Sequence, residues 1–319
     1  MMRRTSVAVF SLLLVGAAQA DDLTPLCVPD QSSMPQSWRP SGNVQKSLST
    51  APWSAEETAD ADRAIRAGLG QMIVHYDKHP KSVEVLWDDS VQSVIEVTYS
   101  GSNRPEIQAI GREAARKNLT RLIDPLLKRK PQSITCDDYE STLALTIYAH
   151  NLLDKDDPRV AAMVAFNNDA YDECGSLADA MGADYKEILK KSHPQTEEIF
   201  ELVIWSTWLI EAELVPGLDR PKGASEFSPA LWRYLETFRL KDASEFRRGA
   251  LDEEFTDIGY LATHIAFIPT GYQRHPLYVE DSPNTYRFIR RNLYALMEVG
   301  EADLLAEFVD TLRQYGCDP

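Results

Sequence analysis

A short segment near the C-terminal end, residues 257–276, carries many of the side chains in this sequence that could take part in a reaction. Asp257, Tyr260 and His264 are separated by three and four residues, so on a helix they would share one face. An imidazole titrates near neutral pH, which makes His264 a candidate general acid or base. Asp257 would orient an imidazole or act as a second acid–base group. On this interpretation, loss of His264 abolishes turnover and leaves the fold intact.

The loop that follows the predicted helix, residues 271–276, is also rich in functional groups. His275 is a further candidate acid–base residue, and Arg274 suits the binding of a carboxylate or another anion. Tyr272, together with Tyr260 on the helix, would donate hydrogen bonds to a substrate or stack against it. A loop fixed by glycine and proline at the end of a core helix is a common place for a site.

The same residues also have a purely structural interpretation, and the sequence leaves both open. Asp257 would then cap a helix, and His264 would be a core histidine with its hydrogen bonds satisfied. Arg274 and His275 would hold a turn to nearby carboxylates. A single histidine on an apolar face lacks the second motif that would define the geometry of a site.

Motifs for metals and cofactors are scarce. His75 and His79 have the i, i+4 spacing that can bind a metal, but no partner carboxylate is evident, so we predict no metal. The sequence has no GxSxG, HExxH, P-loop, GxGxxG or CxxCH motif, and we predict no cofactor. Trp205, Trp208 and Trp232 occupy apolar helical positions typical of a core.

The N-terminal end predicts export. Residues 1–20 combine two arginines, a short apolar stretch and Ala18-Gln19-Ala20, which is the pattern of a cleaved secretory signal peptide. Residues 21–52 lack periodicity and predict an extended N-terminal arm, followed by a single domain over residues 53–319. No later segment is long and apolar enough to span a membrane, so we expect a periplasmic or secreted protein.

The net charge bears on possible binding partners, and the cysteine content bears on disulfide bonds. The formal net charge of −16 becomes −18 without the two signal arginines, which disfavours binding to nucleic acid. Four cysteines in an exported chain suggest two disulfides, with three possible connectivities. We favour Cys27–Cys317, which would restrain the termini, with Cys136–Cys174; a free reactive thiol at Cys174 is the alternative.

The elements that must position these residues are helices throughout. Ser54 and Glu57 have the capping-box spacing, and Pro229 and Pro283 follow serines as helix starts. Pro125 should kink or end a helix. Residues 83–99 fit a helix or a strand, and context favours the helix. The remaining helices are expected near residues 54–79, 107–127, 138–153, 158–174, 176–191, 196–212, 229–240, 257–268, 284–299 and 302–315.

A weak repeat runs through the predicted helices. Thr135, Thr196 and Thr256 recur at intervals of 61 and 60 residues, each with an acid close behind and an aromatic residue four positions later. We interpret each threonine as a helix cap. Two helices per interval predict repeated helical hairpins, which form a short α-solenoid if the array stays open and an α/α-toroid if it closes.

The C-terminal third contains Tyr260-Leu261-Ala262-Thr263-His264, Gly271-Tyr272 and Asp303-Leu304-Leu305-Ala306-Glu307. In these short motifs it resembles poorly characterised helical proteins of the α/α-toroid kind. The resemblance implies a fold more than a reaction. We therefore expect an exported non-redox enzyme, a lyase, isomerase or hydrolase, that acts on a small organic substrate in a helical cavity. The alternative is a non-catalytic envelope protein that presents a concave helical surface to a protein partner.

Overall fold

The computed structural model describes residues 54–86, 90–91, 94, 104–172, 174–246, 254–271 and 277–315. The predicted signal peptide, the N-terminal arm, Cys27 and Cys317 lie outside this part of the chain.

The described residues form an all-α structure without strands, which confirms the predicted class. Three short 3-10 helices, Pro131–Ser133, Cys136–Asp138 and Ala243–Glu245, lie between the α-helices. The α-helices are α1 (Ala55–Lys78), α2 (Pro80–Leu86), α4 (Pro105–Leu126), α5 (Tyr139–Leu152), α6 (Pro158–Tyr171), α7 (Leu177–Met181), α8 (Tyr185–Ile188), α9 (Thr196–Ala212), α10 (Ala224–Leu235), α11 (Glu254–Phe267), α12 (Pro283–Val299) and α13 (Ala302–Gln314).

Several helix ends follow the local sequence signals. The Ser54 hydroxyl accepts the backbone N–H of Glu57 at 3.2 Å, and the Glu57 carboxylate accepts the N–H of Ser54 at 2.7 Å, so the predicted capping box is present. Pro283 is the first residue of α12, where its missing N–H costs nothing. Helix α4 ends one residue after Pro125.

Other predicted boundaries are wrong. Residues 176–191 form two short helices, because Gly182 ends α7 in the left-handed conformation (φ +64°) and Asp184 then caps α8. Pro229 lies inside α10, which begins at Ala224. Pro229 is the sixth residue of α10 and cannot donate to the carbonyl of Ser225, so the helix continues through it with one hydrogen bond fewer.

The threonine-cap interpretation also needs correction. Gln195 is the N-cap of α9 and Thr196 is the first helical residue. Thr256 lies within α11, and Thr135 precedes a 3-10 helix without making a side-chain cap. The three threonines nevertheless lie shortly before or near the start of α5, α9 and α11, and these three helices contact one another in chain order.

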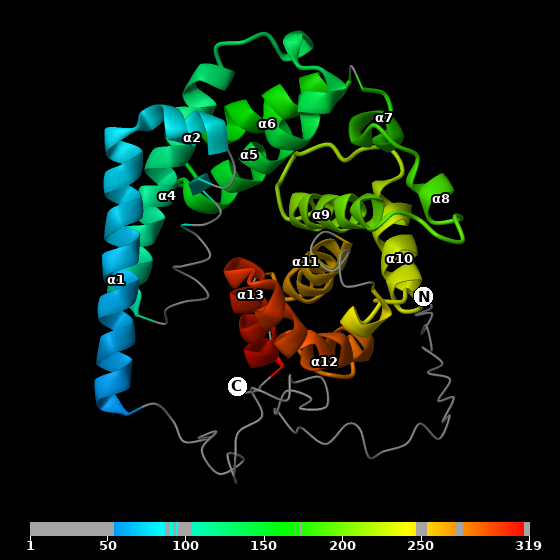
Figure 1. Ribbon diagram of the computed structural model, residues 1–319. Coiled ribbons are helices and arrows are strands. Elements are labelled where there is room, and N and C mark those ends of the chain that lie inside the picture. Colours follow the sequence, from blue (N-terminus) through cyan, green and yellow to red (C-terminus); the bar gives the residue numbers. More distant parts are fainter. Residues whose placement is uncertain are drawn as a thin grey trace, which may run out of the picture.

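These helices pack in a row. Helix α4 contacts α5, α5 contacts α9, α9 contacts α11, and α11 contacts α13 (Figure 1). Each of α6, α10 and α12 packs against the row helix that precedes it in the chain, so α5–α6, α9–α10 and α11–α12 are pairs of successive helices in contact. Helices α1 and α2 pack against α4 at the other end of the row.

Helix α11 belongs to two hydrophobic cores. Leu261 and Ile265 pack into a large core that extends back to α1, whereas Phe255, Ile258 and Ala262 pack into a smaller core formed with α12 and α13. Because both faces of α11 are buried, this helix fixes the C-terminal helices onto the rest of the row.

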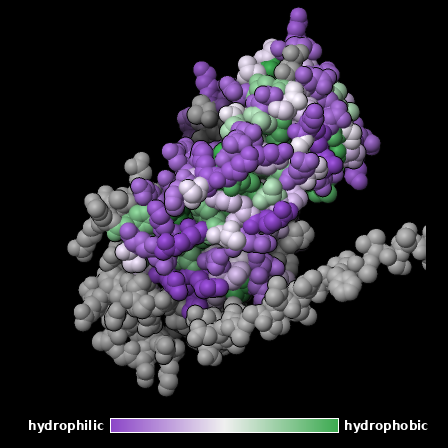
Figure 2. All heavy atoms as spheres, turned by 90° about the vertical axis from the view of Figure 1, so that its right-hand side faces the viewer, coloured by the Kyte–Doolittle hydropathy of each residue, from purple (hydrophilic) through white to green (hydrophobic). Residues whose placement is uncertain are grey.

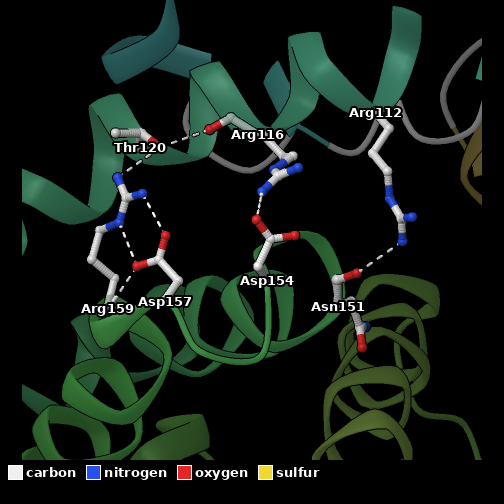
Figure 3. A network of polar contacts seen from close by, with 7 residues as sticks. All are labelled: Arg112, Arg116, Thr120, Asn151, Asp154, Asp157 and Arg159. Atoms are coloured by element: carbon white, nitrogen blue, oxygen red, sulfur yellow. Dashed lines mark hydrogen bonds and ion pairs between the residues drawn. The ribbon is translucent and has the colours of Figure 1, made fainter. Parts of the chain in front are cut away.

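Arginine side chains connect α4 to the end of α5, the α5–α6 loop and the start of α6 (Figure 3). The carboxylate of Asp157 caps α6 by accepting the N–H of Arg159 at 3.0 Å, and the Arg159 guanidinium lowers the pKa of Asp157 to about 2. The contacts to α4 are from Arg112 to the carbonyl of Asn151 at 3.4 Å, from Arg116 to Asp154 at 2.8 Å, and from Arg159 to the hydroxyl of Thr120 at 3.1 Å.

Cys136 and Cys174 form a disulfide, with Cα atoms 5.3 Å apart, as predicted for this pair. The bridge joins the start of the α5–α6 pair to its end. Within the described ranges, no helix is long and apolar enough to cross a membrane. Figure 2 shows one face of the molecule, on which hydrophilic residues predominate and hydrophobic ones form only small patches.

Candidate functional site

The predicted reactive face lies on α11. Asp257 is exposed near the start of this helix, and Tyr260 and His264 follow it on one side. Tyr272, Arg274 and His275 lie outside the described residues, so their assigned roles stay predictions.

His264 is held in an aromatic environment. Its ring packs edge-on against Phe200 of α9, with centroids 4.8 Å apart, and lies 5.8 Å from the ring of Phe267. Its Nδ1 is 2.8 Å from the carbonyl oxygen of Tyr260, which can only accept, so Nδ1 carries the proton. Burial lowers the pKa of His264, and the hydrogen bond to Tyr260 offsets this only in part. The neutral imidazole therefore packs between α9 and α11, and its catalytic role stays a prediction.

Helix α13 supplies partners for the other polar groups on α11. The Tyr260 hydroxyl donates to Asp303 at 3.0 Å, and the Thr263 hydroxyl lies 2.6 Å from a carboxylate oxygen of Glu307. Burial, followed by the hydrogen bond to Asp303, raises the pKa of Tyr260 to about 12. Two of the motifs that carried the toroid resemblance thus meet in the structure and hydrogen-bond to each other.

The environment of His264 predicts a specific pH dependence of stability. The folded state holds this imidazole neutral, whereas the unfolded chain protonates it near its ordinary pKa of about 6.5. The unfolded state therefore binds more protons below that pH, and the free energy of unfolding should fall as the pH drops below about 6.5. Replacement of His264 by Phe, which keeps an aromatic ring between Phe200 and Phe267, should remove this part of the pH dependence.

Urea unfolding at pH 7.5 and pH 5.0 would measure the effect. The matched control is His193→Gln, since His193 is exposed and should leave the pH dependence of the wild type unchanged. Equal pH dependence in wild type and His264→Phe would show that the His264 ring is accessible to protons in the folded state.

Glu140 of α5 is a partly buried carboxylate away from the α11 face. It accepts a hydrogen bond from the indole N–H of Trp208 at 2.9 Å. Burial, and less strongly the charge of Glu201, raise the pKa of Glu140, while the hydrogen bond from Trp208 lowers it.

Among the described residues, no group of three or more His, Cys, Asp or Glu side chains is arranged to hold a metal ion, and His75 and His79 have no third ligand there.

A cavity of about 620 Å³ lies where the C-terminal parts of α9, α10 and α11 meet the start of α12. We call it the α9–α12 cavity. Leu235, Ile265 and Leu277 line its floor and are at most 8% exposed. Ile210 and Trp232 complete the apolar part of the lining. A volume of this size is typical of pockets for organic ligands.

The rim of the α9–α12 cavity is acidic. Glu236, Glu280 and Asp281 line it and are exposed, and no lysine or arginine is among those lining residues that the structure describes. Asp281 accepts the N–H of Tyr278 at 3.1 Å, whereas Glu236 and Glu280 make no side-chain ion pair or hydrogen bond within the described part of the chain. The cavity thus offers an apolar floor and two carboxylates available to a ligand.

Comparison with known proteins adds no relatives. No protein-family model matches the chain, and no match was found among the curated proteins or the solved structures. The function must therefore be argued from the geometry of the chain alone.

The sequence analysis did not identify the α9–α12 cavity. Neither Asp257, Tyr260 nor His264 lines it, although Thr270 and Leu277, on either side of the predicted loop, do. Its lining comes from four separate stretches of the chain, and no local motif joins them. Trp232, a large aromatic residue on a predicted helix, is the sequence feature that could have indicated this cavity; the structure shows it partly buried in the lining.

Proposed function

We propose that the protein binds a small organic molecule with an apolar body and a positively charged or hydrogen-bond-donating group in the α9–α12 cavity. The observation that carries the proposal is the combination of a buried apolar floor with the exposed carboxylates of Glu236 and Glu280 at the rim, which have no ion-pair partner among the described residues. The floor favours apolar surface at about 25 cal/mol per Å² buried, and the rim selects the charge of the ligand.

This proposal keeps the small organic substrate expected from the sequence and places it away from the His264 face. A non-redox reaction in this cavity would use Glu236 and Glu280 as proton acceptors or donors, because His264 lies outside the lining and is enclosed by Phe200 and Phe267. We propose that such an activity, like the protein itself, belongs outside the cytoplasm, as the N-terminal sequence suggests.

We further propose that the helices form a short α-solenoid. The support is the order of contacts from α4 through α5, α9 and α11 to α13, with a second layer of α6, α10 and α12. We favour a small molecule over an envelope protein as the ligand, because the α9–α12 cavity has the volume of a pocket for an organic ligand.

The proposal can be tested with three phenyl compounds whose polar groups are positively charged, neutral and negatively charged: phenethylamine, phenethyl alcohol and phenylacetate. Titration calorimetry on the wild type should show saturable binding, with the amine bound more tightly than the alcohol and the carboxylate most weakly. Replacement of both Glu236 and Glu280 by Gln should reduce the preference for the amine by about two- to fivefold, the range expected for exposed ion pairs.

Two matched controls locate the binding. Ile210→Trp narrows the cavity and should weaken all three probes, whereas Leu214→Trp, at an exposed position outside the lining, should not. Glu254→Gln removes an exposed charge elsewhere and should keep the amine preference. Saturable binding of none of the probes, or equal effects of the two tryptophan substitutions, would rule out this cavity as the site.

A further inference from the structure

A second cavity, of about 280 Å³, lies between the segment that follows α10 and the N-terminal half of α12. We call it the arginine cavity, because Arg239, Arg287 and Arg291 all line it. Arg287 and Arg291 are four residues apart on α12 and share a face with Asn284. Arg239 approaches from the opposite wall. Three arginines thus line one small space in a chain of net charge −16.

Two carboxylates also line the arginine cavity, and both are already engaged. One oxygen of Glu245 pairs with Arg239 at 2.5 Å, and the other accepts the N–H of Asp242 at 2.9 Å. One oxygen of Asp242 accepts a hydrogen bond from Asn292 at 2.9 Å, and the other lies 3.4 Å from a guanidinium nitrogen of Arg291. Each carboxylate therefore neutralises at most one arginine and has its lone pairs directed to protein donors.

Arg287 is the excess positive charge. It makes no ion pair or hydrogen bond with any residue in the described ranges. It is exposed in the second turn of α12, and the first turn of this helix contains no acidic residue. A cavity with three cations, two engaged anions and a free guanidinium fork is suited to an added anion.

We propose that the arginine cavity binds the oxyanion group, carboxylate or phosphate, of a small molecule, with Arg287 as the main donor. A guanidinium presents parallel N–H groups that match two oxygens of a carboxylate or a phosphate. Arg239 and Arg291 stand on either side of the same space and add positive potential. The wall also contains Asn284, whose amide nitrogen donates to the carbonyl of Glu236 at 3.3 Å and so fixes the end of α10 against α12.

This site is separate from the α9–α12 cavity. The two linings share only Asn284, and their charges are opposite, since one has an acidic rim and the other converging arginines. A ligand suited to one is disfavoured by the other. Failure of one proposal therefore leaves the other in place.

The experiment is titration calorimetry on the wild-type chain in a low-salt, phosphate-free buffer, with inorganic phosphate and succinate as probes and chloride at equal ionic strength as the reference. We expect saturable binding of at least one oxyanion and none of chloride. Arg287→Ala should weaken this binding by about tenfold or more, the loss expected for a charge-assisted hydrogen-bonded contact. Arg287→Lys, which keeps the charge and loses the planar fork, should give an intermediate value.

The matched control is Arg233→Ala, because Arg233 is also exposed and helical, and it lines neither cavity. It should leave oxyanion binding unchanged, and far-ultraviolet circular dichroism should show the same helix content in all variants. Tighter binding of phosphate than succinate, or the reverse, tells which class of oxyanion the site prefers. Absence of saturable binding by both probes, or equal losses in Arg233→Ala and Arg287→Ala, would overturn the proposal.

Discussion

Removal of the disulfide by Cys136→Ser with Cys174→Ser should lower the free energy of unfolding by about 4 kcal/mol. The two cysteines are 38 residues apart, and a cross-link over a loop of that length restricts the unfolded chain by about this amount in the loop-entropy description. The bridge closes the α5–α6 pair at its open end, and Cys174 is buried in the larger core. The change is measurable as a shift in the denaturant midpoint, and a reducing agent should produce the same shift in a variant that lacks Cys27 and Cys317.

A second pair of substitutions, Cys27→Ser with Cys317→Ser, serves as the control. These positions lie outside the described residues, and their predicted bridge would restrain the termini. Peptide mapping without reduction should recover Cys136 linked to Cys174 in both the wild type and this control. Recovery of Cys136 linked to another cysteine, or a midpoint insensitive to reduction, would contradict the pairing.

The sequence predicted the helical class because this depends on local signals repeated along the chain. The capping box at Ser54 and the proline at position 283 act within one turn, and the structure contains both. The interval of about 60 residues correctly grouped α5, α9 and α11, which lie next to one another in the row. Errors arose where two local signals compete, as at Gly182, whose left-handed conformation divides one expected helix into two.

The candidate sites were less predictable, since they depend on which distant segments meet. His264 has a residue type and spacing suited to catalysis, yet only the three-dimensional structure shows Phe200 against its ring and the carbonyl of Tyr260 on its Nδ1. The lining of the α9–α12 cavity is drawn from apolar and acidic residues that are ordinary in any helix. In the arginine cavity, Arg287 and Arg291 belong to one predicted helix, but the sequence does not show that Arg239 lines the same space.

Helices α11 and α13 approach each other closely at Gly259 and Leu304. Substitutions at these two positions should therefore change the free energy of unfolding non-additively. A Cβ atom at Gly259 would lie 2.6 Å from Cδ2 of Leu304, whose side chain is fully buried. Leu304→Ala should cost about 2–5 kcal/mol, as expected for a buried leucine. Gly259→Ala alone gains about 1 kcal/mol of helix propensity but overpacks the contact by about 1–3 kcal/mol, so its net effect in the wild type should be neutral or destabilising.

In the Leu304→Ala background the same Gly259→Ala substitution should become stabilising by about 1 kcal/mol, because the clash is gone while the propensity gain remains. Chemical denaturation of the four proteins in this cycle gives the coupling energy directly. The control is Gly68→Ala on α1, where the glycine is exposed and no atom lies within 4 Å of the added carbon. It should stabilise both backgrounds by about 0.5–1 kcal/mol. If Gly259→Ala behaves like Gly68→Ala in the wild type, then α13 does not approach α11 as closely as the structure shows, and the contacts of Tyr260 and Thr263 with α13 would have to be reconsidered with it.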